Sequence, residues 1–314
     1  GLAEEDLTGA DRLRLPVFGA MGGMLAAGAV HALLARAQEG AGPWWVASMG
    51  TDLALGLAVL SLLWERVPGA LKTFFSTMAM FSLLGSAAVL VAAQGALPSW
   101  PVLSAAGACL AVLLVMRLVR VNVVSPYLLT GAVLWTALAV EGCQALLAGP
   151  LTALFVPARS RDVNSSPLQV LEQDLLPTAC CAALPLWVFV CAGTAPLGAP
   201  DGAMSTQGAL ATFLGMFPAK AAGIFGACWI GTRLRLCSLP AGTGWKEFAG
   251  AALLGGAGFT VNVFLGLAVV GLDGPQVNEI RLAATASSAL SLAGGYAVLR
   301  YVLARRRNKV IQRS

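Results

Sequence analysis

Long runs of apolar residues, separated by short polar stretches, make up most of the chain. Ten runs follow one another, and each is long enough to cross a bilayer or to form part of a compact helical pair. They cover residues 15–35, 44–63, 73–93, 102–119, 127–141, 143–157, 178–197, 205–232, 248–271 and 279–303. The pattern predicts an all-α polytopic membrane protein with about ten transmembrane segments. The boundary between the fifth and sixth runs is the least distinct.

Composition supports a membrane protein and indicates which partner to expect. Of the 314 residues, 58% are hydrophobic and 11% are charged, and the mean hydropathy is +0.78. Soluble domains carry about 25% charged residues. The lipid bilayer is therefore the expected partner. The net charge of +5 does not indicate nucleic-acid binding, because the basic residues lie in loops between apolar runs. The seven cysteines form no C-x-x-C pair, so neither a zinc site nor a disulfide framework is expected.

The basic residues divide unequally between the two sides of this ten-segment arrangement. If the segments cross alternately, only Arg36 and Arg281 lie on one side, and Lys220 lies within a segment. The positive-inside rule then predicts that both termini are cytoplasmic, in a bacterial-type inner membrane or an organelle inner membrane. The basic residues expected on the cytoplasmic side are Arg12, Arg14, Arg66, Lys72, Arg117, Arg120, Arg159, Arg161, Arg233, Arg235, Lys246, Arg300, Arg305, Arg306, Arg307, Lys309 and Arg313.

Two charged residues lie deep inside apolar runs, Asp52 in the second and Lys220 in the eighth. A charged residue at membrane depth is costly, so each is a candidate functional residue. The two are expected to pair, because either one alone would tend to neutralise. The alternative for Asp52 is a structural role as a buried helix cap. The small residues beside Asp52, which permit a break in the helix, are Ser48, Gly50, Thr51 and Gly56.

A second interruption is predicted in the ninth segment, in the glycine-rich run 255–262 that contains Gly258, Thr260 and Asn262. No strand precedes this run and apolar sequence follows it, so a broken helix is expected rather than a nucleotide-binding loop. Two broken helices at corresponding places in two inverted halves indicate a transporter site near the middle of the membrane. His31, in the first segment, is expected to be an interfacial packing residue, with a proton relay as the alternative.

Several short motifs resemble the NhaA family of sodium/proton antiporters. They recur in the family's order across most of the chain. The matching stretches are Thr51–Gly56, Arg66–Pro68 with Leu71–Lys72, Leu134–Ala137, Leu147–Gly149, Ser166–Pro167 with Leu171–Glu172, Leu234–Leu236 with Leu239–Pro240, and Gly258–Thr260.

The resemblance implies an NhaA-like inverted-repeat fold with two discontinuous crossing helices. The first repeat is expected over residues 1–93, the panel of interface helices over 94–204, the second repeat over 205–304, and a basic tail over 305–314. It also implies that Glu172 occupies a position linked to pH sensing. The chain is expected to be a transporter-type protein rather than an enzyme.

The chain departs from the family pattern at the residues that matter most. Where the family carries two adjacent aspartates that bind the cation and exchange protons, this sequence has Ser82 and Leu83. The family's histidine before Leu-Ala-Gly is Gln144, and an asparagine of the seventh segment is Cys191. The family's first two helices are expected to be missing, which would leave a place for a second copy or for another membrane subunit.

Two interpretations follow from these departures. The favoured one is a degenerate, non-transporting antiporter homologue that serves as a structural subunit of a membrane assembly. The alternative is an altered antiporter that uses Asp52 as its only core carboxylate. In either case the vestigial or altered ion site comprises Thr51, Asp52, Ser82, Leu83 and Lys220. No cofactor is expected, and a sodium ion only if transport is retained.

Overall fold

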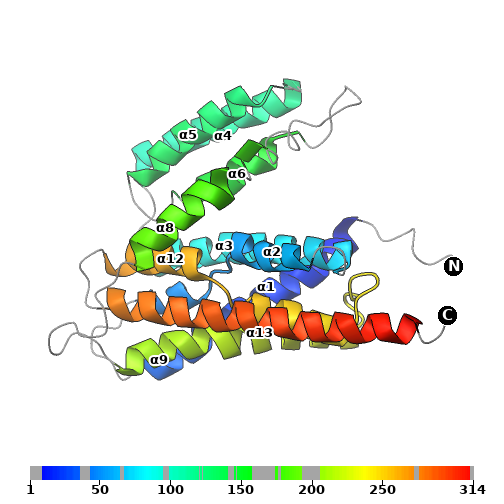
Figure 1. Cartoon of the computed structure of the whole chain (residues 1–314). Helices are drawn as coiled ribbons and strands as arrows, with labels where there is room; N and C mark the ends of the chain where they lie inside the picture. Colours follow the sequence, from blue (N-terminus) through cyan, green and yellow to red (C-terminus); the bar gives the residue numbers. More distant parts are fainter. Residues whose placement is uncertain are drawn as a thin grey trace. The chain divides into compact units, whose positions relative to one another are not determined.

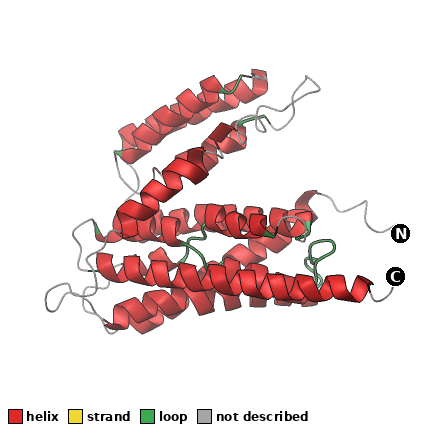
Figure 2. Cartoon of the chain, in the orientation of Figure 1, coloured by secondary structure: helices red, strands yellow, loops and turns green. Residues whose placement is uncertain are grey.

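The computed structural model describes residues 9–35, 43–63, 67–94, 99–119, 121, 123–140, 145, 147–157, 174–175, 178–192, 206–271 and 276–311. Within these ranges the chain forms helices and no strand, as Figure 2 shows. The predicted helical class is therefore confirmed. Gln144 and Glu172, which were singled out in the sequence, lie outside the described residues.

Helices occupy each of the ten predicted segments. In the described residues, six are long and apolar enough to cross a membrane, or seven if one bent pair counts as a single span. The number ten thus stays a prediction, since α5, α6 and α8 are shorter. The elements are α1 Gly9–Ala35, η1 Pro43–Ser48, α2 Leu53–Leu62, α3 Gly69–Gln94, α4 Trp100–Val119, α5 Ser125–Ala139, α6 Ala148–Phe155, η3 Ala179–Ala183, α8 Leu184–Ala192, α9 Thr206–Leu214, η4 Gly215–Ala219, α10 Lys220–Arg233, α11 Trp245–Leu254, α12 Phe259–Val270 and α13 Val277–Ile311.

The chain divides into two compact units, one of residues 1–86 with 194–314 and the other of residues 87–193. In the second unit, α4, α5 and α6 pack around a core that includes Leu113, Tyr127 and Leu134. Arg117 donates from Nη1 to the carbonyl of Leu154 at 2.7 Å, which ties α4 to α6.

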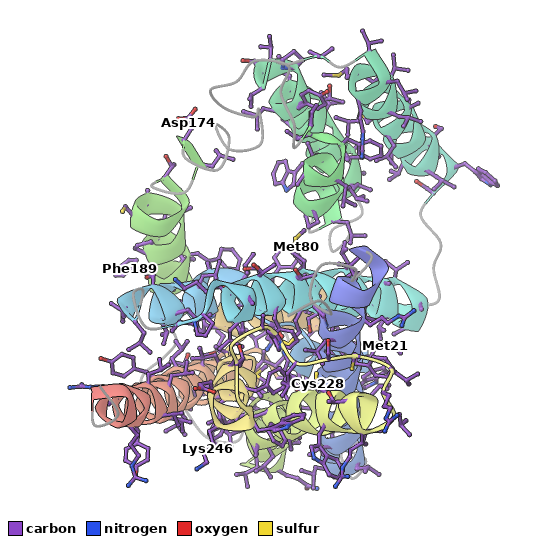
Figure 3. All side chains as sticks on the ribbon, turned by 90° about the vertical axis from the view of Figure 1, so that its right-hand side faces the viewer. Met21, Met80, Asp174, Phe189, Cys228 and Lys246 are labelled. Atoms are coloured by element: carbon purple, nitrogen blue, oxygen red, sulfur yellow. The ribbon has the colours of Figure 1, made fainter. Side chains whose placement is uncertain are left out.

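The first unit contains both interrupted helices and the candidate site. Its long C-terminal helix α13 runs beside α9 and also packs against α11 and α12 (Figure 1). Cys228 of α10 is fully buried and contacts the Leu15 carbonyl of α1, whereas Met21 of α1 is exposed at the surface of the unit (Figure 3). Exposed apolar side chains of this kind suit a lipid-facing surface, where the surrounding acyl chains are themselves apolar.

Helices α1 and α10 approach each other at two glycines. A Cβ on Gly223 would lie 2.3 Å from the carbonyl oxygen of Gly22, and a Cβ on Gly22 would lie 2.5 Å from that of Gly223. Small residues allow helix backbones to come this close in a membrane, where packing rather than the hydrophobic effect holds helices together. This contact fixes α10, and with it Lys220 at the start of α10.

Replacing Gly223 with alanine should separate α1 from α10, because the added methyl group meets backbone atoms that cannot move aside. Overpacking of this kind costs about 1–3 kcal/mol, and the unfolding midpoint of the purified protein in detergent should fall accordingly. Gly226→Ala on the same helix is the matched control, since a Cβ there meets nothing within 4 Å. Equal midpoints for the two variants would refute the close approach.

Candidate ion site

Asp52 lies at the first helix interruption and caps the half-helix that follows. After η1 the backbone runs without regular structure through residues 49–52, and Asp52 has the extended conformation of an N-cap residue. Its Oδ1 accepts hydrogen bonds from the amides of Ala54 at 3.2 Å and Leu55 at 3.3 Å. Aspartate is among the preferred N-cap residues, and its negative charge suits the positive end of a helix.

The second interruption meets the same carboxylate. Helices α11 and α12 are bent by 42° at the break between them. Asp52 Oδ2 accepts from the Thr260 amide at 3.1 Å and from the Thr260 hydroxyl, and the Asp52 amide donates to the Ala257 carbonyl at 2.8 Å. One carboxylate therefore serves the N-terminal ends of two half-helices. Thr260 and Asn262, expected in the break, lie in the first turn of α12 instead.

Lys220 provides the positive charge that balances Asp52. It binds at the carbonyl end of a helical segment, whereas Asp52 lies at N-terminal ends. Lys220 is fully buried and follows the π-helical turn η4, which contains Pro218. Proline lacks an amide donor, and π-turns are frequent at functional sites. Lys220 Nζ donates to the carbonyl of Gly50, just beyond the C-terminal end of η1. A cation is favoured at such a carbonyl end.

Asp52 and Lys220 form no direct hydrogen bond with each other among the described residues, and their predicted pairing is limited to an electrostatic interaction. Within the described residues the Asp52 carboxylate is satisfied by amide and hydroxyl donors, and the Lys220 ammonium by a carbonyl. The two groups still interact electrostatically. Each charged side chain is bound mainly by groups at the helix breaks. Amide and hydroxyl donors bind the Asp52 carboxylate, and a carbonyl acceptor binds the Lys220 ammonium.

Hydroxyl and carbonyl oxygens lie next to Asp52. Thr51 Oγ1 lies 3.2 Å from Ser82 Oγ of α3 and 3.3 Å from the carbonyl oxygen of Gly255. Thr51 and Ser82 are both buried. Leu83 follows Ser82 on α3 and supplies no side-chain ligand. The structure thus brings together all the predicted ion-site residues that have polar side chains.

The two breaks touch through glycines. A Cβ on Gly258 would lie 2.6 Å from the carbonyl oxygen of Gly50, so the backbones are in contact there. This crossing places the ends of four helical segments around one buried region. Lys220, Asp52, Thr51 and Ser82 all contribute to it.

Sequence reasoning missed Ser288. Ser288 Oγ of α13 accepts the Gly258 amide at 3.2 Å, which stabilises the second break. The one sequence feature that could have indicated this role is that Ser288 is a small polar residue within an apolar run. His31 is fully buried, with Nδ1 2.5 Å from Ser48 Oγ and its ring edge-on to Trp44 at a centroid distance of 4.6 Å, as a packing residue would be. Its place at a membrane interface stays a prediction.

Comparison with known proteins identifies the family of the chain. The Na⁺/H⁺ antiporter 1 family matches residues 2–299. The chain is 35% identical to Na⁺/H⁺ antiporter NhaA 1 of Pseudomonas putida over 285 residues, covering 90% of this chain and 72% of that protein. It is 36% identical to NhaA of Rhodospirillum rubrum over 294 residues, covering 91% and 74% respectively. The chain therefore belongs to the NhaA family of Na⁺/H⁺ antiporters.

Proposed function

We propose that the chain is a membrane-embedded sodium/proton antiporter with an altered site that relies on Asp52 as its only core carboxylate. One observation carries this: Asp52 joins the N-terminal ends of two half-helices while Lys220 sits at a carbonyl end of the same crossing. Membership of the antiporter family supports the same activity.

Charge balance suggests how such a site would exchange ions. Asp52 contributes one negative charge, and the protonated Lys220 contributes one positive charge. A sodium ion entering this buried region would be repelled by the ammonium, and repulsion between like charges is strong where the dielectric is low. Release of the Lys220 proton removes that repulsion and restores the balance. The site then carries either the proton or the sodium ion, so exchange is one for one and electroneutral.

The oxygen atoms near Asp52 supply the ligands in this scheme. Sodium is a hard cation that prefers oxygen donors. The Asp52 carboxylate and the hydroxyls of Thr51, Ser82 and Thr260 lie together at the crossing. The Thr260 hydroxyl would have to stop donating to Asp52 before its oxygen could bind a cation. The loss of this hydrogen bond reduces the free energy gained on cation binding.

The finer architecture is also a proposal. We infer ten crossings, with residues 1–93 and 205–304 as inverted repeats and both termini cytoplasmic in a bacterial inner membrane. The lopsided distribution of basic residues supports this orientation. In Figure 1 the start of α1 and the end of α13 lie at the same end of their unit, which agrees with termini on one side.

A non-transporting membrane subunit is the second candidate. The observation that favours it is the satisfied state of Asp52, whose two oxygens accept four hydrogen bonds, together with Ser82 and Leu83 on α3. In that case the crossing is structural, and a second copy or another membrane subunit would be the partner. Reconstituted protein that shows no sodium/proton exchange would support this candidate.

Reconstituted wild-type protein should move protons outward through the vesicle membrane when sodium is driven inward. The rate should not change when potassium with valinomycin clamps the membrane potential, because no net charge moves. Asp52→Asn should lower the rate at least about tenfold, since the sodium ion then loses its only charged ligand, a loss of about 1.4 kcal/mol or more. A pH-sensitive dye inside the vesicles measures the rate.

Asp174→Asn is the matched control, because this carboxylate is exposed. It should exchange at the wild-type rate. Exchange that persists in Asp52→Asn, or that follows the membrane potential, contradicts the one-carboxylate mechanism.

Restoring carboxylates on α3 should increase exchange and change its electrical character. The double variant Ser82→Asp with Leu83→Asp adds acceptors beside Thr51, so more than one proton can be released per sodium ion. The exchange rate should rise and should become sensitive to the membrane potential. Ser82→Asn with Leu83→Asn has similar shape without charge and should not show either effect. Equal behaviour of the two double variants would argue against a working crossing.

A further inference from the structure

Asn262 is a buried amide whose hydrogen-bonding capacity is unused. It lies in the first turn of α12 with 0% of its surface exposed. Neither Oδ1 nor Nδ2 has a partner among the described residues. An asparagine side chain offers two donor hydrogens and an acceptor oxygen, and buried polar groups are nearly always satisfied. A leucine of similar shape would fill this space without leaving polar atoms unpaired.

The amide occupies a notch that two glycines leave at the crossing. A Cβ on Gly50 would lie 2.6 Å from Asn262 Oδ1, and a Cβ on Gly258 would lie 2.1 Å from Asn262 Nδ2. The carbonyl of Gly50 also accepts the hydrogen bond from Lys220. Both the unpaired amide and the Lys220 ammonium, whose proton the proposed exchange releases, therefore border Gly50.

A second unpaired oxygen flanks the same break. Ser291 Oγ of α13 is buried and has no partner among the described residues. A Cβ on Gly256 would lie 2.5 Å from it. Two unsatisfied neutral oxygens beside one helix interruption indicate a bound species that the chain itself does not supply. Neutral oxygens suit a hard cation.

We propose that Asn262 Oδ1 is a ligand of the transported alkali cation, in place of the carboxylate oxygens that Ser82 and Leu83 do not provide. This inference rests on the proposed antiport function. The amide adds an oxygen without adding a charge, so the one-for-one balance between the sodium ion and the Lys220 proton is preserved. Asn262 thereby sets the affinity for the cation rather than the stoichiometry.

Sodium-dependent stability of the full chain in detergent tests this proposal. Sodium chloride replaces choline chloride at constant ionic strength, and the unfolding midpoint is followed. A ligand that binds the folded state raises that midpoint. The sodium concentration for half the effect should be at least about tenfold higher for Asn262→Leu than for wild type. In choline alone this variant should unfold at the wild-type temperature or above, because an unpaired buried amide has been removed.

Two further variants make the result decisive. Thr212→Val is the matched control, because this buried hydroxyl of α9 already bonds to the Gly208 carbonyl at 2.9 Å. It should keep the wild-type sodium response. Asn262→Asp retains the oxygen and should also respond to sodium, which covers the case in which Asn262→Leu does not fold. A loss of the response in Asn262→Asp would overturn the proposal.

The remaining outcomes separate this inference from the function on which it rests. An unchanged sodium midpoint in Asn262→Leu would overturn the ligand role while leaving sodium binding by the chain intact. No sodium response in wild type would overturn both the ligand role and the proposed antiport.

Discussion

The hydrogen bonding of one carboxylate holds the two interrupted helices together. Asp52 Oδ1 caps α2 and Asp52 Oδ2 binds the first turn of α12, so each oxygen serves a different half-helix. In a bilayer, unpaired backbone amides cannot turn to water, and each costs several kcal/mol, as for amide transfer to an apolar medium. Asp52 stabilises the crossing because it satisfies amide and hydroxyl donors that the two helix breaks would otherwise leave unpaired.

The same constraint accounts for the placement of Lys220. A negative charge at two positive helix ends leaves the carbonyl ends of the preceding segments unbalanced, and Lys220 binds one of them at Gly50. Helix macrodipoles favour this arrangement of charges. Because the two charges are held by backbone ends, neither depends on the other for its position. In the proposed mechanism, a sodium ion therefore replaces the Lys220 proton without dismantling the crossing.

Much of this arrangement can be predicted from the sequence. The charge of Asp52 within an apolar run, the adjoining small residues and the glycine-rich run near Gly258 predict both helix breaks. The helix over each apolar run is likewise confirmed. Asp52 and Lys220 interact electrostatically but form no direct hydrogen bond among the described residues. Sequence alone does not show that backbone groups at the breaks point at these two side chains. The roles of Ser288 and Asn262 depend on which helix faces meet, and no single-residue signal reveals that.

The site also differs from the family's pattern in where its oxygens come from. With Ser82 and Leu83 on α3, the proposed ligands are hydroxyl, amide and carbonyl groups at the breaks, such as those of Thr51 and Asn262. Neutral oxygens bind a cation less strongly than carboxylates but add no charge. A site of this composition therefore suits exchange of one cation for one proton. Because few of the proposed ligands are charged, cation binding would depend on a rigid crossing that holds the neutral oxygens in place.

The most direct test of the crossing is a double-mutant cycle between Asp52 and Thr260. Asp52→Asn keeps Oδ1 for α2 and replaces the oxygen that accepts from Thr260, while Thr260→Val removes the hydroxyl donor. Chemical unfolding in detergent gives the stability of wild type, both single variants and the double variant. The account predicts a coupling of about 1–3 kcal/mol, as expected for a buried charged hydrogen bond. Stability changes that add within about 0.5 kcal/mol would contradict it.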